Sequence, residues 1–435
     1  MALLQRRKPS RFSRGYRDKP LLDFLGGDLW LWGLPIALIL LAGGLIASTQ
    51  RQAGLAEWSN HWTTGLAGLV AAWLLTRVDL QRLRSLLVPL YLINLAGLVA
   101  VRFIGTTALG AQRWIAVGPF QLQPSEFAKL AVILLLGGVL ARFPVERPRD
   151  LLRPFAVIIV PWGLVFLQPD LGTSLVFGAL LLVMLFWSGM PLAWIVLLIS
   201  AIPAAILGGL HQAGMGDGYL IALLAWLLAM MVAALKTLPW PRLGALLVLT
   251  GQLSAAAVTP WLWQYGLKDY QRDRLVLFLD PAKDPLGGGY HLLQSTIGIG
   301  SGGLFGTGLL RGHLTKLQFI PEQHTDFIFS ALGEELGLLG CGLVLLAFGF
   351  WSWRLLAVAD QARSDFESLV VVGILAMVMF QVLVNVSMTI GLGPVTGIPL
   401  PFLSYGRSAL ITNCLALGMV ASVQRHARLE ARRRL

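Results

Sequence analysis

Long apolar runs recur along this chain and are separated by short polar segments. Runs long enough to cross a bilayer begin near residue 29 and continue to about residue 424, and one span needs about 20 mostly apolar residues. The pattern predicts an all-α polytopic membrane protein with about twelve transmembrane helices, near 29–48, 61–78, 85–103, 124–142, 152–168, 171–189, 192–210, 218–235, 243–265, 326–350, 367–390 and 406–424.

The segment 271–326 interrupts this pattern. It is the longest run without an apolar stretch of membrane length, and it gathers acids, bases, histidines and many glycines. We therefore expect residues 266–325 to form a large loop outside the membrane, where polar chemistry is concentrated.

Basic residues in the short loops predict the orientation of the helices. With the Arg-rich tail 1–28 in the cytoplasm, the other basic segments also fall inside, at 77–84, 142–153, 236–242, 354–363 and 425–435. Both termini are then cytoplasmic, and we expect the tails 1–20 and 425–435 to be disordered and to bind the lipid surface. The irregular segments fall on the outer face, including 104–123, 266–325 and 391–405.

Composition supports a membrane protein. Hydrophobic residues make up 56% of the chain, the mean hydropathy is +0.72 and charged residues make up only 13%, so lipid is the main solvent. The net charge of +12 is spread over short segments between apolar runs, which indicates contacts with membrane lipids and no nucleic-acid partner. Cys341 and Cys414 lie in apolar runs and are interpreted as buried small hydrophobes.

Two Asp-Pro pairs stand in the large loop. Asp280 and Asp284 are each followed by proline, and a run of glycines, 287–289, comes next. Proline disfavours helix at the preceding residue and glycine allows a tight path, so the segment is a turn that presents carboxylates. The pair could act in acid–base chemistry or only cap the turn, and spacing alone leaves both interpretations open.

Further along, six glycines interleave with Ile and Leu between Gly298 and Gly308. Such a strip can let backbone amides approach an anionic group, or it can be a re-entrant loop. Glu334 and Glu335 then lie side by side in an apolar helix. Adjacent residues point about 100° apart on a helix, so at least one is expected to face the bundle interior with a partner.

The segment before that helix carries His324, Thr325 and Asp326. Thr325 or Asp326 suits the N-cap of the helix. His324 could be a base, a metal ligand or a hydrogen-bonding strut, and a strut is the commoner role for a single histidine.

The outer segment 104–123 and the helix after it supply further candidates. Glu126 and Lys129 have i, i+3 spacing and can pair near the membrane surface, as a structural ion pair or beside a substrate. In the functional interpretation, Arg113 and Lys129 supply positive charge for a phosphate. Asp170, which precedes another helix, adds a carboxylate and can cap that helix.

The last irregular segment is 397–408. Pro399 and Pro401 break any helix there, and irregular backbone near membrane depth is tolerated where it lines a cavity. Ser404 lacks a triad order, so it is interpreted as cavity wall or helix cap. Arg407 places a cation at the start of the final helix.

Five ordered runs resemble a known family. They are QPSEFAKL at 123–130, LQPDLGTSLVF at 167–177, DPAKDPLGGGYHLLQSTIGIGSGG at 280–303, FIPEQHTDFIFSALGEELG at 319–337 and LPFLSYGRSAL at 400–410. They are similar to the shape, elongation, division and sporulation (SEDS) family of bacterial peptidoglycan glycosyltransferases, and the likeness covers most of the chain after residue 29. His291 and the segment 280–330 look more like the elongation branch than the division branch.

The resemblance implies that the chain polymerises lipid II on the outer face of the bacterial inner membrane beside a class B penicillin-binding protein. It implies an essential aspartate at Asp284 rather than Asp280, and functional roles for Arg113, Glu126, Lys129, Asp170 and His324. Asp284 would be the general base, and Arg113, Lys129 or a divalent cation such as Mg or Mn would balance the departing pyrophosphate.

Two departures from the family pattern stand out. The family usually has ten helices, which makes 211–265 an inserted helix pair within the transmembrane domain 29–424. Arg407 replaces the second glycine of a SYGGS run, where it could contact substrate phosphate or pair with Glu334. A lipid flippase or a non-catalytic scaffold for a transpeptidase would fit the composition equally, and only the ordered motifs favour an enzyme.

Overall fold

A computed structural model describes residues 28–50, 57–108, 111–118, 120–168, 170–212, 214, 216–279, 284, 289–317, 319–320 and 323–433. Within these ranges a helix occupies each of the twelve predicted positions. Nine helices in this part of the chain are long and apolar enough to cross a membrane. The multi-pass helical membrane fold is therefore confirmed, whereas the count of twelve spans stays a prediction.

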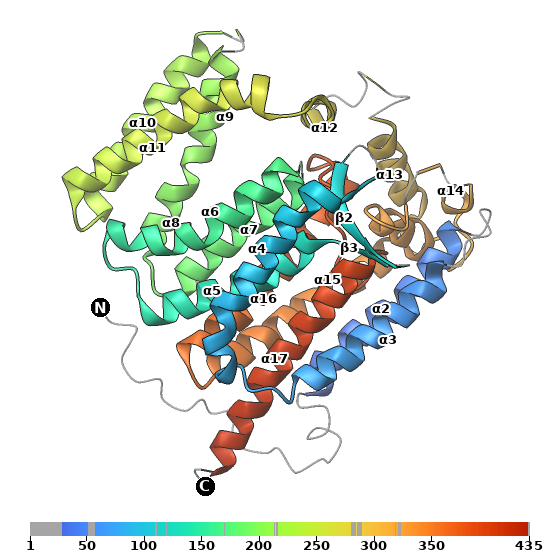
Figure 1. Cartoon of the computed structure of the whole chain (residues 1–435). Helices are drawn as coiled ribbons and strands as arrows, with labels where there is room; N and C mark the ends of the chain where they lie inside the picture. The colour runs from blue at the N-terminus through green and yellow to red at the C-terminus, as the bar shows by residue number, and fades with distance from the viewer. Residues whose placement is uncertain are drawn as a thin grey trace. The chain divides into compact units, whose positions relative to one another are not determined.

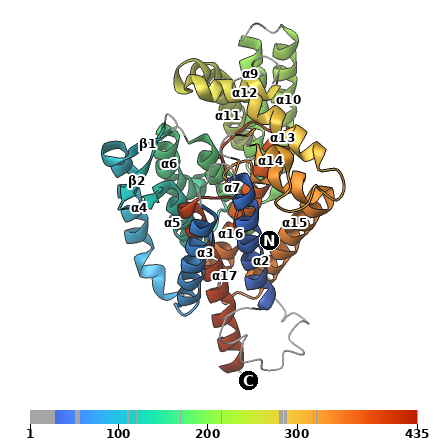
Figure 2. The same ribbon diagram turned by 90° about the vertical axis from the view of Figure 1, so that its right-hand side faces the viewer.

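The chain divides into two compact units. Unit one comprises Met1–Arg142, Arg153–Met184 and Arg274–Leu435. Its helices, shown in Figures 1 and 2, are α2 (Leu29–Thr49), α3 (Glu57–Leu75), α4 (Leu87–Ile104), α5 (Pro124–Arg142), α6 (Leu152–Leu167), α7 (Leu171–Trp187), α13 (Tyr290–Ser301), α14 (His313–Lys316), α15 (Ile328–Asp360), α16 (Asp365–Thr389) and α17 (Arg407–Arg433).

Small residues bring the helices of unit one close together. An ideal Cβ on Gly418 of α17 would lie 2.6 Å from the carbonyl oxygen of Ala72 in α3, and one on Gly68 would lie 2.8 Å from Cys414 Sγ. Close backbone approach of this kind is how membrane helices gain packing energy without a hydrophobic driving force. Cys341 and Cys414 are buried and free, as predicted.

The segment 104–123 is a small antiparallel sheet, where the pattern of apolar runs predicted irregular chain. It consists of β1 (Thr106–Ala108), β2 (Ala111–Val117) and β3 (Phe120–Leu122), in the order β1-β2-β3. Gly118, with φ of 60°, makes the turn between β2 and β3, a conformation that glycine adopts without strain. β1 and β3 have only three residues each, and β2, AQRWIAV, lacks the strict alternation of apolar and polar residues by which a strand is predicted.

The C-terminal tail also differs from expectation. Residues 425–435 were expected to be disordered, but α17 continues without a break to Arg433. Arg432 and Arg433 occupy its last turn, where positive charge is favoured by the helix dipole. The tail 1–27 lies outside the described residues.

The predicted loop 266–325 contains three helices, α12 (Asp269–Leu279), α13 and α14. After α13 the glycine-rich chain binds to α15 at a kink. Gly337 has φ of 64° and ψ of −167° inside α15, and beyond it Leu338 N donates to Gly303 O at 2.9 Å and Leu339 N to Leu304 O at 3.1 Å. The glycine-rich strip is thus fixed to a helix.

Both glutamates of α15 hold the segment that follows this strip. Glu334 accepts from Leu314 N at 2.8 Å and Thr315 N at 2.9 Å, and Glu335 accepts from Leu310 N at 3.0 Å and from the Ser48 hydroxyl. The amides that meet these carboxylates lie after the glycine-rich strip, whereas Thr307 N and Gly308 N within it donate to the backbone carbonyls of Glu334 and Glu335 at 3.0 and 2.9 Å. Both glutamates face partners because the strip wraps around the helix.

The start of α15 corrects another prediction. The helix begins at Ile328 with Phe327 as its N-cap, and no side chain caps it. Thr325 and Asp326 are therefore not the N-cap, because the turn 323–327 continues past them before the helix begins. This turn leaves Asp326 available for a contact elsewhere.

Unit two comprises Phe143–Leu152 and Leu185–Asp273. It contains a 3-10 turn (Pro148–Leu151), α8 (Leu192–Ile199), α9 (Ala201–Gln212), α10 (Gly218–Thr237) and α11 (Pro241–Trp261). The predicted helix 192–210 is broken at Ser200, whose hydroxyl donates to Leu197 O at 2.6 Å. The predicted insertion 211–265 corresponds to α10 and α11, and its status as an insertion stays a prediction.

Candidate functional site

Asp170 lies at the N-terminus of α7 and caps it, as its position predicted. Its Oδ1 accepts from Thr173 N at 3.1 Å and its Oδ2 accepts from Thr173 Oγ1 at 3.0 Å. The side chain is buried, so these bonds compensate for its lost hydration. Gln123 adds a third donor, with Nε2 3.3 Å from Oδ2.

Gln123 joins three distant segments. Besides Asp170, its Nε2 donates to Ser125 Oγ at 3.1 Å, and its backbone N–H donates to Ser408 Oγ at 3.0 Å. The Ser408 hydroxyl in turn donates to Gln121 O at 3.2 Å. The starts of α5, α7 and α17 are therefore held together beside β3. Sequence reasoning missed Gln123, although it opens the run QPSEFAKL.

Two arginines lie at the small sheet. Arg113 of β2 is half-buried, and its Nε donates to Gln168 O at 3.4 Å. The guanidinium carbon of Arg407 lies 5.4 Å from the ring centroid of Phe120 in β3. Arg407 is also the first residue of α17, where the helix dipole favours negative charge. The two cations and this helix end favour an anion.

Glu126 and Lys129 form the predicted ion pair, with Nζ 2.8 Å from Oε2. The pair is buried within the protein, since the side chains are only 4% and 1% exposed. Packing of α4, α16 and α17 around α5 encloses it. Glu126 therefore neutralises the charge of Lys129, which supports the structural interpretation of the pair.

A second polar cluster lies around the irregular segment 391–405. Asn385 Nδ2 donates to the carbonyls of Asp326 and Ile398, both at 2.8 Å. Gly397 has φ of 73°, and an ideal Cβ there would lie 3.3 Å from Asp326 Oδ2 and 3.7 Å from Arg274 Nη1. A side chain at Gly397 would therefore crowd an acid and a base.

This cluster adjoins Asp170 and His291. An ideal Cβ on Gly172, two residues after Asp170, would lie 2.9 Å from Thr396 O. Burial, and then the charge of Arg274, lower the pKa of His291, so His291 is neutral at pH 7. Sequence reasoning missed Arg274. A single basic residue in a polar loop does not show which side chains it will meet.

His324 has the contacts of a strut. Its Nε2 lies 2.9 Å from Glu57 Oε2, and its carbonyl oxygen accepts from Tyr405 N at 2.9 Å. The His324 and Tyr405 rings lie 5.4 Å apart. Ser404 is buried, and its Oγ accepts from Leu400 N at 2.7 Å, so it caps a turn.

Asp284 lies in the segment before α13 and is exposed. Its carbonyl oxygen accepts from Gly289 N at 3.0 Å, which closes a turn. Asp280 lies outside the described residues, so the ranking of the two aspartates stays a prediction. In both views of unit one, α13 and β2 lie toward the end opposite the C-terminus of α17 (Figures 1 and 2).

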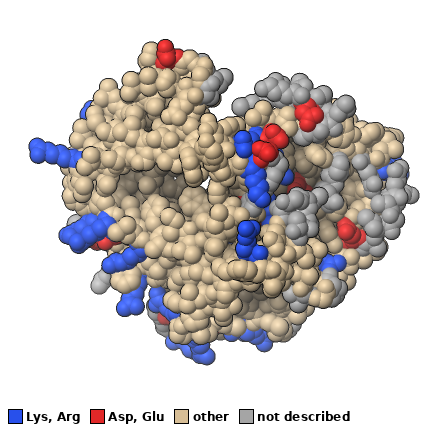
Figure 3. All heavy atoms as spheres, turned by 45° about the horizontal axis from the view of Figure 1, so that its top comes forward, with Lys and Arg blue, Asp and Glu red and all other residues tan. Residues whose placement is uncertain are grey.

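Charged side chains are sparse on the face seen in Figure 3, where they form a few groups on a surface that is otherwise neither acidic nor basic. Among the described residues, no group of three His, Cys, Asp or Glu side chains could hold a metal ion. The predicted divalent cation stays a prediction.

Known proteins match nearly the whole described chain. The FtsW/RodA/SpoVE family model, described as "cell cycle protein", matches residues 28–213 and 201–429. The peptidoglycan glycosyltransferase MrdB of Escherichia coli K12 is 37% identical over 78% of this chain and 78% of its own length. The peptidoglycan glycosyltransferase RodA of Treponema pallidum is 34% identical over 84% of this chain and 89% of its own.

A solved structure agrees with these matches. A chain from a peptidoglycan synthase complex, described for its coordination of polymerization and crosslinking, is 30% identical to this one. It superposes with a TM-score of 0.68 and covers 92% of this chain and 98% of its own. The chain therefore belongs to the FtsW/RodA/SpoVE family of multi-pass membrane proteins.

Proposed function

We propose that this chain is a peptidoglycan glycosyltransferase that polymerises lipid II into β-1,4-linked glycan strands for cell-wall elongation. Its relatives are named for peptidoglycan glycosyl transfer. One observation carries the proposal to this chain: motif segments far apart in sequence bond to one another. Gln123 bonds to Asp170 and Ser408, and His324 bonds to Tyr405.

Asp284 is the proposed general base. Its exposed position lets it take the proton from the 4-hydroxyl of the acceptor sugar. The hydroxyl oxygen then attacks C1 of the donor sugar with inversion, and the bond from C1 to the polyprenyl pyrophosphate breaks. A base in this role contributes about 10²–10⁴ in rate.

Negative charge grows on the departing pyrophosphate, and fixed positive groups stabilise it. Arg113 and Arg407 suit this role because both lie at the small sheet, Arg113 bonded to Gln168 O just before Asp170 and Arg407 at the N-terminus of α17. Lys129 is less suited because Glu126 already neutralises it. A divalent cation at the site would neutralise charge on the pyrophosphate and would be held by its oxygens together with one or two carboxylates and water, as Mg²⁺ is beside phosphates.

The proposed location is the bacterial inner membrane, with both termini in the cytoplasm and the active site on the outer face. The proposed partner is a class B penicillin-binding protein, which would crosslink the strands that this chain makes. The similar chain from a synthase complex supports such a partner.

Polymerisation of lipid II by the purified full chain, alone and with a transpeptidase, tests the proposal. We expect Asp284→Asn to lower the rate by about 10²–10⁴, while Asp280→Asn, its matched neighbour, retains most activity. Wild-type activity in Asp284→Asn would refute its role. A wild-type protein that moves lipid II across a bilayer without forming polymer would identify a flippase, and one that only stimulates the transpeptidase would identify a scaffold.

A further inference from the structure

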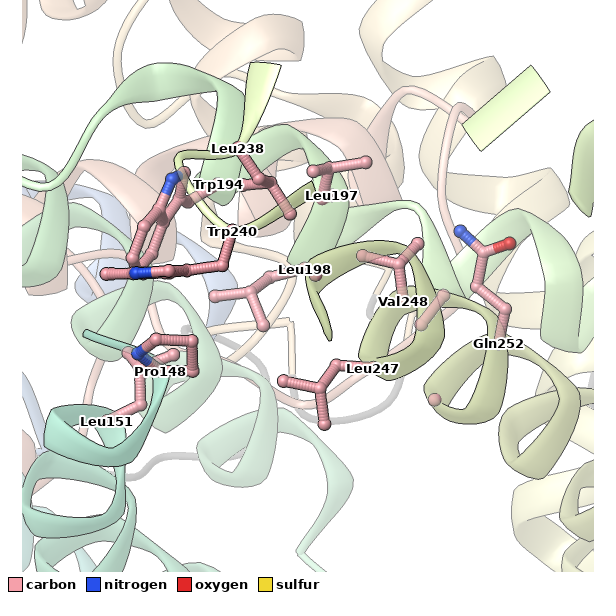
Figure 4. A pocket seen from close by; sticks show the side chains of 13 residues that line it. Pro148, Leu151, Trp194, Leu197, Leu198, Leu238, Trp240, Leu247, Val248 and Gln252 are labelled. Atoms are coloured by element: carbon pink, nitrogen blue, oxygen red, sulfur yellow. The ribbon is translucent and has the colours of Figure 1, made fainter. Parts of the chain in front are cut away.

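Unit two contains an apolar groove of about 190 Å³ (Figure 4). Pro148 and Leu151 line one part of it, and α8, the first residue of α9, α11 and the link between α10 and α11 line the rest. Trp194 and Trp240 meet edge to face at one end, with ring centroids 5.6 Å apart. The loops 142–153 and 236–242, which were both predicted to lie on the cytoplasmic side, therefore line the same groove.

The length of the groove matches one lipid leaflet. Along α11 its lining extends from Trp240, just before the helix, to Gln252, and twelve residues of helix rise about 18 Å. Half of a bilayer's hydrocarbon core is about 15 Å. No atom lies within 4 Å of an ideal Cβ on Gly251, so open space continues along this helix face.

Positive charge gathers at the tryptophan end. Arg147 and Arg149 flank the lining residue Pro148, while Lys236 and Arg242 are each two residues from a lining residue; all four are exposed. None forms an ion pair with another residue of the described chain. The nearby Asp150 carboxylate already accepts from the backbone N–H of Arg147 at 2.9 Å.

One polar atom of the groove lacks a partner. Trp194 is 7% exposed, and its Nε1 has no hydrogen-bond partner among the described residues. A buried indole N–H usually donates to an acceptor. A phosphate or ester oxygen at the tryptophan end would accept this bond.

We propose that the groove binds an anionic phospholipid, with one acyl chain along α11 and the phosphate among these four cations. Tryptophan and basic residues mark the level of lipid headgroups in membrane proteins. A partner helix is about 10 Å across and would not fit a groove of this volume. The lining residues all belong to unit two, whereas the residues proposed for catalysis belong to unit one.

Native mass spectrometry of the purified full chain tests this site, with phosphatidylglycerol or phosphatidylcholine of the same acyl chains added. We expect wild-type protein to retain phosphatidylglycerol about tenfold better than phosphatidylcholine, because cations attract the anionic headgroup. Gly251→Leu fills the groove and should lower this retention about tenfold. Gly349→Leu is the matched control, since that exposed glycine also has no atom near an ideal Cβ.

Two further variants separate the parts of the site. Arg149→Gln with Arg242→Gln should remove the preference for phosphatidylglycerol while phosphatidylcholine binding stays. Trp194→Phe keeps the groove's shape and should weaken retention of both lipids. Unchanged retention in Gly251→Leu, equal retention of the two lipids by wild type, or loss of a co-purified membrane protein from Gly251→Leu without loss of lipid would overturn the proposal. Leucine is a better helix former than glycine, and wild-type polymerisation by Gly251→Leu verifies its fold.

Discussion

Substitutions in the buried pair Glu126–Lys129 can distinguish a structural role of the pair from a role in the reaction. Lys129→Met removes an ammonium that is 1% exposed and 2.8 Å from a carboxylate. The change leaves Glu126 buried without its cation, which typically costs about 3–5 kcal/mol. Since tenfold in an equilibrium constant is about 1.4 kcal/mol, the unfolding constant should rise by about 10²–10³ or more.

Replacing both partners should restore stability. Glu126→Leu with Lys129→Met puts apolar side chains of similar volume in place of the pair, which is often neutral or stabilising. The two single changes are therefore expected to be strongly non-additive, with a coupling energy of at least about 2 kcal/mol. Unfolding in mixed detergent micelles measures the free energy of all four proteins of this cycle.

Polymerisation by the double variant then separates the two roles of Lys129. A structural pair predicts that the folded double variant keeps most activity. A folded but inactive double variant would show that Glu126 or Lys129 takes part in the reaction. Additive single changes, each below about 1 kcal/mol, would refute the inference that the pair is buried and mutually dependent.

Two further predictions concern stability. Gly337→Ala should destabilise the protein by at least about 1–3 kcal/mol, because φ is 64° there and a Cβ would lie 2.4 Å from Gly306 N. Gly342→Ala is the control, since Gly342 lies on the same helix and has open space around an ideal Cβ. Thermal unfolding should show that this control raises the free energy of unfolding by about 0.5–1 kcal/mol. Burial raises the pKa of Asp79, but Arg363 and a backbone N–H outweigh it, so the net pKa lies below 3.8. The stability that Asp79 contributes is thus complete above its unfolded pKa and is lost as pH falls through the lowered folded value; unfolding between pH 6 and 2 should show this loss in wild type, and an undiminished slope in Asp79→Asn would contradict it.

The positions of the helices could be predicted from the sequence alone. A bilayer requires every spanning backbone group to bond within its own segment, so apolar length identifies a helix without knowledge of its neighbours. The same local logic placed the Asp170 cap and the Glu126–Lys129 pair, whose partners lie within three residues.

Contacts between distant segments needed the tertiary structure. Nothing in the periodicity of α15 shows that Glu334 and Glu335 hold the segment after the glycine-rich strip, because that segment returns to the helix from 20 to 25 residues earlier. The bond from Gln123 to Ser408 spans 285 residues, and the approach of Arg274 to Gly397 depends on two loops meeting. The apolar pattern determined where the long apolar helices form, because each helix satisfies its own backbone. Only the tertiary structure decided which side chains meet, because those bonds depend on how the segments pack.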